Sequence, residues 1–259
     1  MCSGDIEECF YDAARAFNYA DRYQTPVIHL IDKALANSSM SYKTFDPSRV
    51  KIERGQLLTG TDVAGKTYRR FEFTDSGVSP RLPIGTPGAV FWNTGDEHYE
   101  SGHITEESMI RTRMVEKRMK KLDTADREIP LDEKINFFGD MDAPAIIVSW
   151  GSPKGAILEA MEILKKDGYK TGFIQVRMPH PLPKEYITKV LGKATKKITV
   201  EGNYSGQLAG IIREKTGIPM DYFVLKWNGR PMSSDEVYDA LLHIMQGNAP
   251  ERQVLNGGS

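Results

Sequence analysis

The fold of this chain is decided by the stretch Ala145-Ile-Ile-Val-Ser149-Trp-Gly-Ser-Pro153. Its first five residues form an almost unbroken apolar run of strand length, as expected of a strand that is covered on both faces. Ser152 is a suitable N-cap and Pro153 suits the first helical position, where its missing N–H costs nothing. The stretch therefore predicts a buried strand that leads directly into a helix over residues 154–168.

The residues that follow repeat this unit. Further strands are expected at 171–176 and 196–201, helices at 184–194 and 207–216, an edge strand at 220–227 and a last helix at 234–246. Strands that alternate with helices call for a parallel sheet with helices on both faces. The fold class is therefore α/β, and we expect the tail from Gly247 to Ser259 to be loose.

The N-terminal part reads as a helix followed by a strand. Residues 6–23 have a helical pattern with an apolar face at Phe10, Ala13, Ala14, Phe17 and Ala20. Residues 25–31 predict a short buried strand, and 32–37 a short helix. No earlier strand is available to pair with 25–31, and a lone strand cannot close a sheet. We therefore expect the chain to begin like the end of a domain whose front is missing.

The middle of the chain is irregular. Residues 50–53 and 68–73 alternate like strands with one exposed face, and prolines and glycines interrupt the rest up to about residue 102. We expect an extended connection with one or two hairpins. A polar, mostly basic helix follows over 106–126, and 129–142 links it to the α/β unit. Its thin apolar stripe comprises Met109, Met114 or Val115, Met119 and Leu122.

Composition narrows the class of protein. A formal net charge of -1 provides no broad electrostatic footprint for nucleic acid or a membrane surface. No apolar run reaches membrane-spanning length and the N-terminus has no signal-peptide pattern, so a cytoplasmic location is expected. Two cysteines, Cys2 and Cys9, exclude a disulfide framework and a four-thiolate metal or cluster site built by this chain alone.

Two loops at the carboxyl edge of the predicted sheet are candidate ligand sites. Gly151 to Gly155 and Gly202 to Gly206 both join a strand to a helix, and open α/β sheets bind ligands at that edge. The candidate cofactor-binding residues are Gly151, Ser152, Asn203 and Gln207. Neither loop matches a standard phosphate-binding motif, so tight packing turns are the alternative. Glu201, Asn203 and Gln207 are also compatible with a docking surface.

The irregular region offers three candidates for substrate or partner contact: Arg81, His98 and His103. Arg81 follows Ser79-Pro80 and suits bidentate binding of a carboxylate or phosphate, the alternative being a structural arginine. The histidines stand among Asp96, Glu97 and Glu100, but their spacing matches no metal motif. A polar turn that caps the basic helix is the alternative, and we assign no metal ligand.

Read together, these segments resemble the C-terminal part of the α subunit of 2-oxoacid:ferredoxin oxidoreductases. The match is carried by three stretches: Gly4-Asp-Ile-Glu-Glu-Cys-Phe-Tyr-Asp-Ala13 through Thr25-Pro-Val-Ile-His-Leu-Ile-Asp-Lys-Ala-Leu-Ala36; Gly77-Val-Ser-Pro-Arg81 through Gly95-Asp-Glu-His98 and Gly102-His-Ile-Thr-Glu106 to Met114-Val-Glu-Lys-Arg-Met119; and Trp150-Gly-Ser152 through Glu201-Gly-Asn-Tyr-Ser-Gly-Gln-Leu208.

The resemblance implies a domain division. Residues 1–36 would end a pyrimidine-binding-type domain for thiamine diphosphate, and 144–247 would form a three-layer transketolase C-terminal-like domain with a parallel sheet. Residues 37–143 would be an extended β-containing linker, and 248–259 a tail. The resemblance further implies CoA-dependent oxidative decarboxylation of a 2-oxoacid to acyl-CoA and CO2, with electrons passing through an iron–sulfur cluster to ferredoxin.

Partners and cofactors follow from the same resemblance. The partner would be a β subunit that supplies most of the site for thiamine diphosphate, Mg2+ and the iron–sulfur cluster. The family's substrate-contacting and diphosphate motifs have no counterpart in this chain, so no catalytic residue is assigned and the chain alone should be inactive. The alternatives are a non-catalytic docking or nucleotide- and CoA-binding regulatory module, and an independent metal enzyme that uses His98 and His103.

Overall fold

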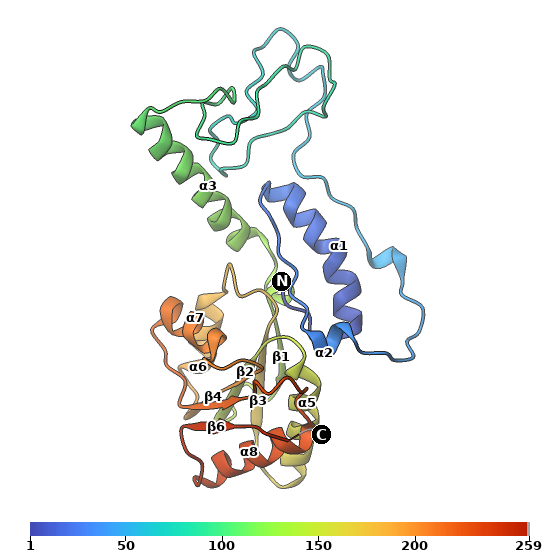
Figure 1. The fold of residues 1–259 in the computed structure, drawn as a ribbon, viewed down its shortest axis with the longest axis vertical. Coiled ribbons are helices and arrows are strands. Elements are labelled where there is room, and N and C mark those ends of the chain that lie inside the picture. The colour runs from blue at the N-terminus through green and yellow to red at the C-terminus, as the bar shows by residue number, and fades with distance from the viewer. Residues whose placement is uncertain (258–259) are drawn as a thin grey trace. The chain divides into compact units, whose positions relative to one another are not determined.

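A computed structural model describes residues 1–257 and divides the chain into two compact units (Figure 1). The first unit comprises Met1–Ala13, Ile28–Pro47 and the chain from Ile129 onward. The second comprises Ala14–Val27 and Ser48–Glu128. Both units are discontinuous in sequence, and the division of the chain into family domains stays a prediction.

Within the described residues, the first unit holds one six-stranded sheet in the order β1-β3-β2-β4-β5-β6. The strand β1 runs antiparallel to β3, and every other neighbouring pair is parallel. The predicted α/β class with a mainly parallel sheet is therefore confirmed. The strands are β1 (Ile135–Gly139), β2 (Ala145–Ser149), β3 (Thr171–Val176), β4 (Lys196–Glu201), β5 (Tyr222–Leu225) and β6 (Arg252–Val254).

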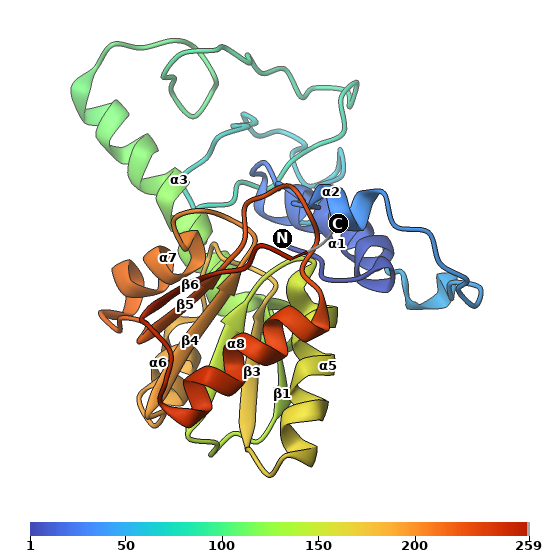
Figure 2. The same ribbon diagram turned by 60° about the horizontal axis from the view of Figure 1, so that its bottom comes forward.

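Helices cover both faces of this sheet (Figures 1 and 2). The helices α5 and α8 pack together on one face, and α6 and α7 pack together on the other. The helices of this unit are α2 (Lys33–Ala36), α4 (Leu131–Lys134), α5 (Pro153–Lys166), α6 (Lys184–Leu191), α7 (Gln207–Thr216) and α8 (Ser234–Gln246). None of the described helices is both long and apolar enough to cross a membrane.

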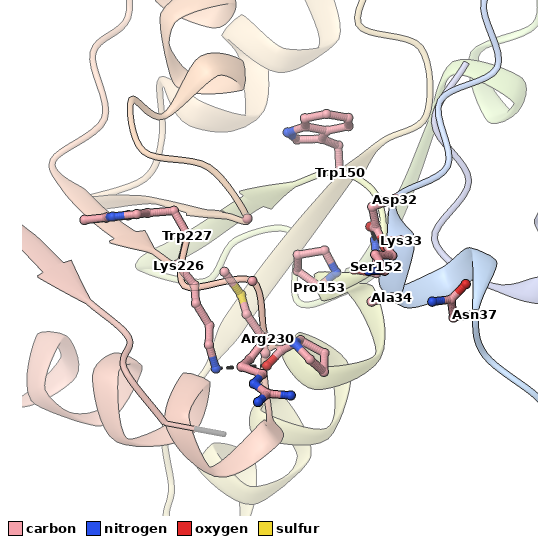
Figure 3. Close-up of a pocket in the computed structure, with 15 residues that line it drawn as sticks. Asp32, Lys33, Ala34, Asn37, Trp150, Ser152, Pro153, Lys226, Trp227 and Arg230 are labelled. Carbon is pink, nitrogen blue, oxygen red and sulfur yellow. Dashed lines mark hydrogen bonds between the residues drawn. The ribbon is translucent and has the colours of Figure 1, made fainter. Parts of the chain in front are cut away.

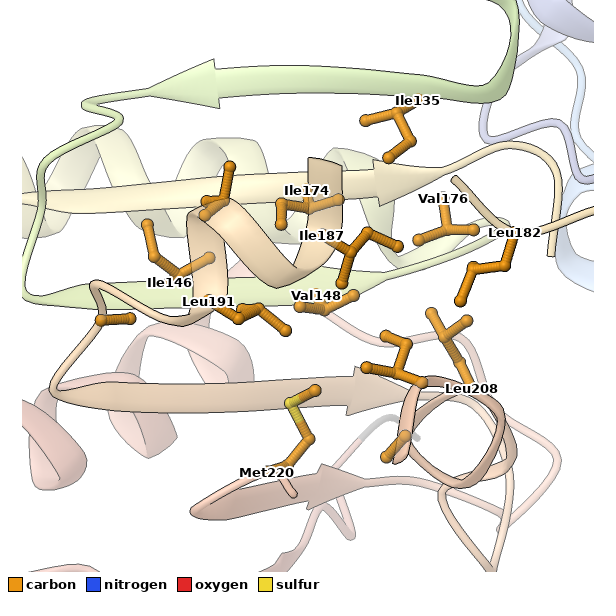
Figure 4. Packing of buried hydrophobic residues seen from close by; sticks show 14 of the residues in the cluster. Ile135, Ile146, Val148, Ile174, Val176, Leu182, Ile187, Leu191, Leu208 and Met220 are labelled. Carbon is orange, nitrogen blue, oxygen red and sulfur yellow. The ribbon is translucent and has the colours of Figure 1, made fainter. Parts of the chain in front are cut away.

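The core lies on the two sides of the central strand β2, and all five residues of that strand are buried. Successive strand side chains point to opposite faces, so Ile147 joins the cluster under α5 and α8. Ile146 and Val148 join the cluster that includes Ile187 and Leu208 (Figure 4). Each such side chain contributes roughly 1.5–3 kcal/mol by leaving water. The predicted buried strand is thus confirmed at the middle of the sheet.

Two strands were missed by the sequence reading. The segment predicted as a link contains β1, and the tail predicted to be loose contains β6. As a result β5 is an inner strand, so the prediction of an edge strand at 220–227 was wrong. Both missed strands are short edge strands with mixed polarity, and backbone pairing with β3 and β5 defines them rather than an apolar pattern.

The start of α5 also differs from the prediction. Ser152 has helical backbone angles and its side chain makes no capping hydrogen bond. Its backbone N–H instead donates to the Oδ2 atom of Asp32, at 3.0 Å. The carboxylate of Asp32 also accepts from the N–H of Leu35 and caps α2. Asp32 thus bonds the backbone of the N-cap residue, and the capping bond predicted from the Ser152 side chain to the first turn of α5 is not formed.

The predicted helix over residues 6–23 is confirmed as α1 (Ile6–Tyr23), but its predicted apolar face was wrong. Phe17 is 75% exposed, whereas Tyr11 and Asp12 are buried. The predicted buried strand at 25–31 was also wrong, since Ile28 is 70% exposed. That segment makes a single parallel bridge, between Cys2 and Leu30.

Charged side chains attach the start of α1 to the sheet. Asp12 forms a buried ion pair with Arg177, which follows β3. Lys154 of α5 bonds both Asp5 and Glu8, and its distance to the Oε1 atom of Glu8 is 2.7 Å. Burial acts to lower the pKa of Lys154, but its bonds to the two carboxylates outweigh burial and raise it. Electrostatic pairing rather than an apolar face therefore fixes this end of α1.

The second unit contains the long helix α3 (Ser108–Glu128) and irregular chain, part of which follows the short 3-10 turn η1 (Pro47–Arg49). The predicted strands at 50–53 and 68–73 were wrong. The N–H groups of Phe71 and Phe73 donate to the backbone and the side chain of Glu100 instead of to a neighbouring strand. A bridge between His98 and Ile104 closes one hairpin-like turn, which agrees with the expectation of at least one hairpin.

Replacing Arg177 by methionine is expected to lower the free energy of unfolding by about 3–5 kcal/mol, because the buried Asp12 carboxylate loses its cation. Urea unfolding would measure the change. The matched control is Lys193→Met, which breaks an exposed pair with Asp142 and should cost less than about 1 kcal/mol. Equal small losses for the two variants would contradict an essential role for the buried pair.

Candidate functional site

A cavity of about 620 Å³ lies at the carboxyl edge of the sheet (Figure 3). The loops after β2, β4 and β5 line it together with α2, because the carboxyl ends of neighbouring parallel strands meet at one edge. Its lining residues are Asp32, Lys33, Ala34, Asn37, Trp150, Gly151, Ser152, Pro153, Gly202, Lys226, Trp227, Gly229, Arg230, Pro231 and Met232. The cavity belongs entirely to the first unit.

Two tryptophans from different strand ends border the cavity. Trp150 follows β2, and its indole N–H donates to the Oε2 atom of Glu201 at 3.2 Å. Trp227 follows β5 and makes an edge contact with Tyr204, with ring centroids 4.8 Å apart. The guanidinium of Arg252 lies over the rings of Tyr204 and Trp227. The site therefore has broad aromatic walls that polar contacts hold in place.

The loop after β4 is organised by the fully buried carboxylate of Glu201. This carboxylate accepts hydrogen bonds from the N–H groups of Leu208 and Ala209 in the first turn of α7, at 2.9 and 3.0 Å. A carboxylate at this end of a helix is favoured because the unpaired N–H groups there carry positive charge. The side-chain amide of Asn203 also donates to Glu201. The N-terminus of α7 is thus satisfied from within the chain.

The loop after β5 is held by a buried lysine. The Nζ atom of Lys226 bonds the Oε2 atom of Glu236 at 2.6 Å and the carbonyl of Pro231 at 2.9 Å, the latter dashed in Figure 3. Burial acts to raise the pKa of Glu236, but the bond from Lys226 and nearby N–H groups hold it below its usual value. The same glutamate forms a capping box with Ser233 at the start of α8. The positive charge of Lys226 is therefore compensated by the carboxylate of Glu236.

Two other cations line the cavity. Within the described part of the chain, the side chains of Lys33 and Arg230 have no hydrogen-bond or ion-pair partner. They come from α2 and from the turn after β5, which are far apart in the sequence. Aromatic walls and unpaired cations together suit a flat ring that carries an anionic group.

The predicted ligand residues divide into two groups. Gly151 and Ser152 line the cavity beside Gly202, as expected of the carboxyl edge. Asn203 lies in the adjoining loop and Gln207 begins α7, and neither is among the described residues that line the cavity. The side-chain oxygen of Asn203 instead accepts from backbone N–H groups, including that of Gln207 at 3.2 Å. A ligand role for these four residues stays a prediction.

The alternative of a docking surface that includes Glu201 was wrong, because that residue has no exposed surface. The sequence reading also missed Trp150, Trp227, Lys33 and Arg230 as site residues. Trp227 and Arg230 carry a usable signal, since both lie in the loop that follows a parallel strand. Lys33 gives none, because only the tertiary fold brings α2 to this edge.

The remaining candidates lie in the second unit and have partners of their own. Arg81 pairs with the carboxylate of Asp21 at 2.8 Å and also bonds a backbone carbonyl. His98 bonds the carbonyl of Tyr99, and His103 bonds the hydroxyl of Ser101. Among residues 1–257, no group of three or more His, Cys, Asp and Glu side chains could hold a metal ion. Substrate or partner contact by Arg81, His98 and His103 stays a prediction.

Two family models match this chain. Residues 1–117 match the pyruvate flavodoxin/ferredoxin oxidoreductase, thiamine diP-bdg model. Residues 143–237 match the model for the pyruvate:ferredoxin oxidoreductase core domain II.

Relatives match over the whole chain. It is 46% identical over 261 residues to the 2-oxoacid:ferredoxin oxidoreductase subunit alpha of Saccharolobus solfataricus, and 42% identical over 260 residues to subunit alpha of oxidoreductase 1 of Sulfurisphaera tokodaii. Each alignment covers 100% of this chain and 40% of the relative. The chain thus spans about two fifths of the length of these curated relatives.

A solved structure also resembles the fold. The 2-oxoglutarate:ferredoxin oxidoreductase from Magnetococcus marinus, with 2-oxoglutarate, coenzyme A and succinyl-CoA bound, matches with a TM-score of 0.84 and 28% sequence identity. The match covers 93% of this chain and 41% of that one.

Proposed function

Because this chain belongs to the family of 2-oxoacid:ferredoxin oxidoreductase α subunits, we propose that it works as part of a CoA-dependent 2-oxoacid:ferredoxin oxidoreductase. The observation that carries the proposal is the 46% identity with an α subunit over the whole chain. The reaction would cleave the bond between the carboxylate and the carbonyl carbon of a 2-oxoacid. It would release CO2, join the acyl group to the sulfur of CoA and pass two electrons to ferredoxin.

We place the catalytic cofactors mainly on a partner β subunit. Thiamine diphosphate with Mg2+ would supply the carbanion chemistry, and an iron–sulfur cluster would carry the electrons. The described residues do not fit a cluster or a metal site of their own, since they hold no suitable group of three ligands. Burial raises the pKa of the Cys2 thiol to about 11, which disfavours the thiolate that a cluster requires. No catalytic residue is assigned to this chain.

We further propose that the cavity at the carboxyl edge contributes to the CoA environment. The relative from Magnetococcus marinus binds coenzyme A, whose adenine ring and phosphates match aromatic walls and unpaired cations. Gly151 and Ser152 would approach the ligand directly, with Asn203 and Gln207 supporting the adjoining loop. Arg81, His98 and His103 would contact substrate or a partner chain elsewhere. A cytoplasmic location, where ferredoxin would be the electron acceptor, completes the proposal.

We expect the isolated chain to show no 2-oxoacid-dependent reduction of ferredoxin, whereas the complex captured with this chain from its source reduces ferredoxin in a CoA-dependent way. The physical reason is that the groups needed to hold the cofactors are missing from this chain. Ferredoxin absorbance and native mass spectrometry of the captured complex would measure this. Tight calorimetric binding of thiamine diphosphate to the isolated chain, or its capture without any partner, would refute the proposal.

Changing Arg230 to alanine in that complex is expected to raise the KM for CoA about tenfold or more, because one charge-assisted hydrogen bond to a phosphate is lost. The KM for the 2-oxoacid should stay the same. Arg213→Ala, which removes an exposed arginine of α7 outside the cavity, is the matched control and should leave both values unchanged. An unchanged KM for CoA in the Arg230 variant would exclude this cavity.

A further inference from the structure

The helix α3 buries lysines where apolar side chains were expected. Of the predicted stripe, Met109 is 72% exposed and Met119 is 57% exposed, so the prediction was wrong for these two residues, while Met114 is buried and Leu122 is partly buried. The buried side of the helix instead carries Met114, Lys117, Thr124 and Ala125. Lys117 lies between Met114 and Lys121 on this side, at spacings of three and four residues. A lysine in the middle of a buried helix face calls for an explanation.

Lys117 is only 8% exposed and has no hydrogen-bond or ion-pair partner among residues 1–257. Most of the Lys117 side chain is buried while its nitrogen keeps some contact with solvent, and a largely desolvated charge is normally paired. Burial, with the positive charges of Lys121 and Arg70 close by, lowers the pKa of Lys117 to about 8. The group is therefore held in a position that suits an anion which the chain itself does not provide.

Two further cations converge beside it on Gln24. The guanidinium of Arg70 donates to the side-chain oxygen of Gln24 at 2.9 Å, and the ammonium of Lys121 donates to its backbone carbonyl at 2.9 Å. Gln24 has a φ of 50°, the one positive φ among the described residues other than glycine. Both oxygens of Gln24 are uncharged, so they do not compensate the positive charge of Arg70 or of Lys121. Burial lowers the pKa of Arg70 and of Lys121 as well.

The nearby carboxylates are already engaged. Glu100 accepts from the N–H of Phe73 and from the guanidinium of Arg69, each at 2.9 Å. Glu97 is held by two parallel hydrogen bonds from Arg118, at 2.9 and 2.8 Å. In the described chain no carboxylate bonds Arg70, Lys117 or Lys121. Three positive charges thus remain uncompensated within the second unit.

We propose that Arg70, Lys117 and Lys121 form a phosphate-binding site in the second unit. A phosphate group carries up to two negative charges and several acceptor oxygens, and so matches three cations better than a single carboxylate does. The planar arginine suits two phosphate oxygens, and the lysines act as point charges. The phosphate would be a free ion or part of an organic ester such as a nucleotide. This site goes beyond the proposed function and does not rest on it.

The test uses the 259-residue chain and inorganic phosphate at constant ionic strength. Phosphate should raise the melting temperature of the wild-type chain, because it binds only the folded state. In Lys117→Met, binding followed by calorimetry should weaken at least about tenfold. Lys120→Met removes an exposed lysine of the same helix and should bind as the wild type does. Adenosine 5′-diphosphate forms a second arm, in which tighter binding than that of phosphate identifies an organic ester as the natural source.

Several outcomes would overturn the site. One is a wild-type chain whose melting temperature responds to phosphate no more than to chloride. Another is equal phosphate affinity in the wild type and in Lys117→Met, or binding of succinate but not of phosphate. If Lys117→Met does not fold, Lys121→Met takes its place with the same expectation, since that lysine is only partly buried. Lys117→Arg keeps the charge and should retain phosphate binding.

The uncompensated charge should also appear as a pH dependence in the absence of phosphate. The native ammonium of Lys117 loses its proton near pH 8, whereas the unfolded one does so near 10.5. Between these values the unfolded state binds more protons, so the stability of the wild type relative to Lys117→Met should rise with pH. Below pH 8 Lys117 is charged in both states, so the full free-energy cost of desolvating its ammonium lowers the stability of the native state. The charges that face this group are Lys121, Arg70, Arg118 and Glu100.

Urea unfolding of the wild type, Lys117→Met and Lys120→Met between pH 7 and 10.5 would measure this difference. Lys117→Met should be the more stable chain near pH 7, and its advantage should shrink toward pH 10.5. For Lys120→Met no such trend is expected, because that side chain is exposed. A constant difference between the wild type and Lys117→Met would contradict a buried, unpaired ammonium.

Discussion

The structure of the first unit depends on the burial of β2 on both faces. Its residues pair in parallel with β3 on one side and β4 on the other, so no backbone group faces water. Its side chains alternate between two apolar clusters, and each cluster needs its own pair of helices as cover. Because β2, β3, β4 and β5 run parallel, the loops that follow these strands lie at one edge of the sheet.

Electrostatic pairing complements this apolar core. The first residues of α1 carry acidic groups that meet Lys154 and Arg177 on the sheet side. A buried ion pair of this kind adds little net stability to the fold, but the loss of one partner is strongly destabilising. The pair therefore serves to hold the start of α1 in place on the sheet. At the cavity, the carboxylates of Glu201 and Glu236 likewise form the hydrogen bonds that hold the loops after β4 and β5. The cations left over, at Lys33 and Arg230, are the ones available to a ligand.

In the second unit, charge is left unbalanced. Local rules of amphipathicity would place apolar residues along the buried side of α3, yet Lys117 and Lys121 occupy that side. Buried charged residues on a helix face that should be apolar are expected at functional sites, where the fold gives up some stability. The proposed function gives the chain a role as a subunit, whereas this cluster points to a ligand that the chain meets through its own side chains. The two inferences concern different units and are independently testable.

The sequence alone predicts the α/β class, the strands β2, β3 and β4, and the helices after them, because long apolar periodicity reports burial directly. It also determined the family, through motifs spread along the whole chain. The folded chain was needed to show which polar residues are buried, that Asp32 caps α2 and bonds the loop after β2, and that β1 and β6 are strands. These features depend on partners far away in the sequence, and a local pattern carries no information about such partners. The cavity and the cluster around Lys117 belong to this second kind.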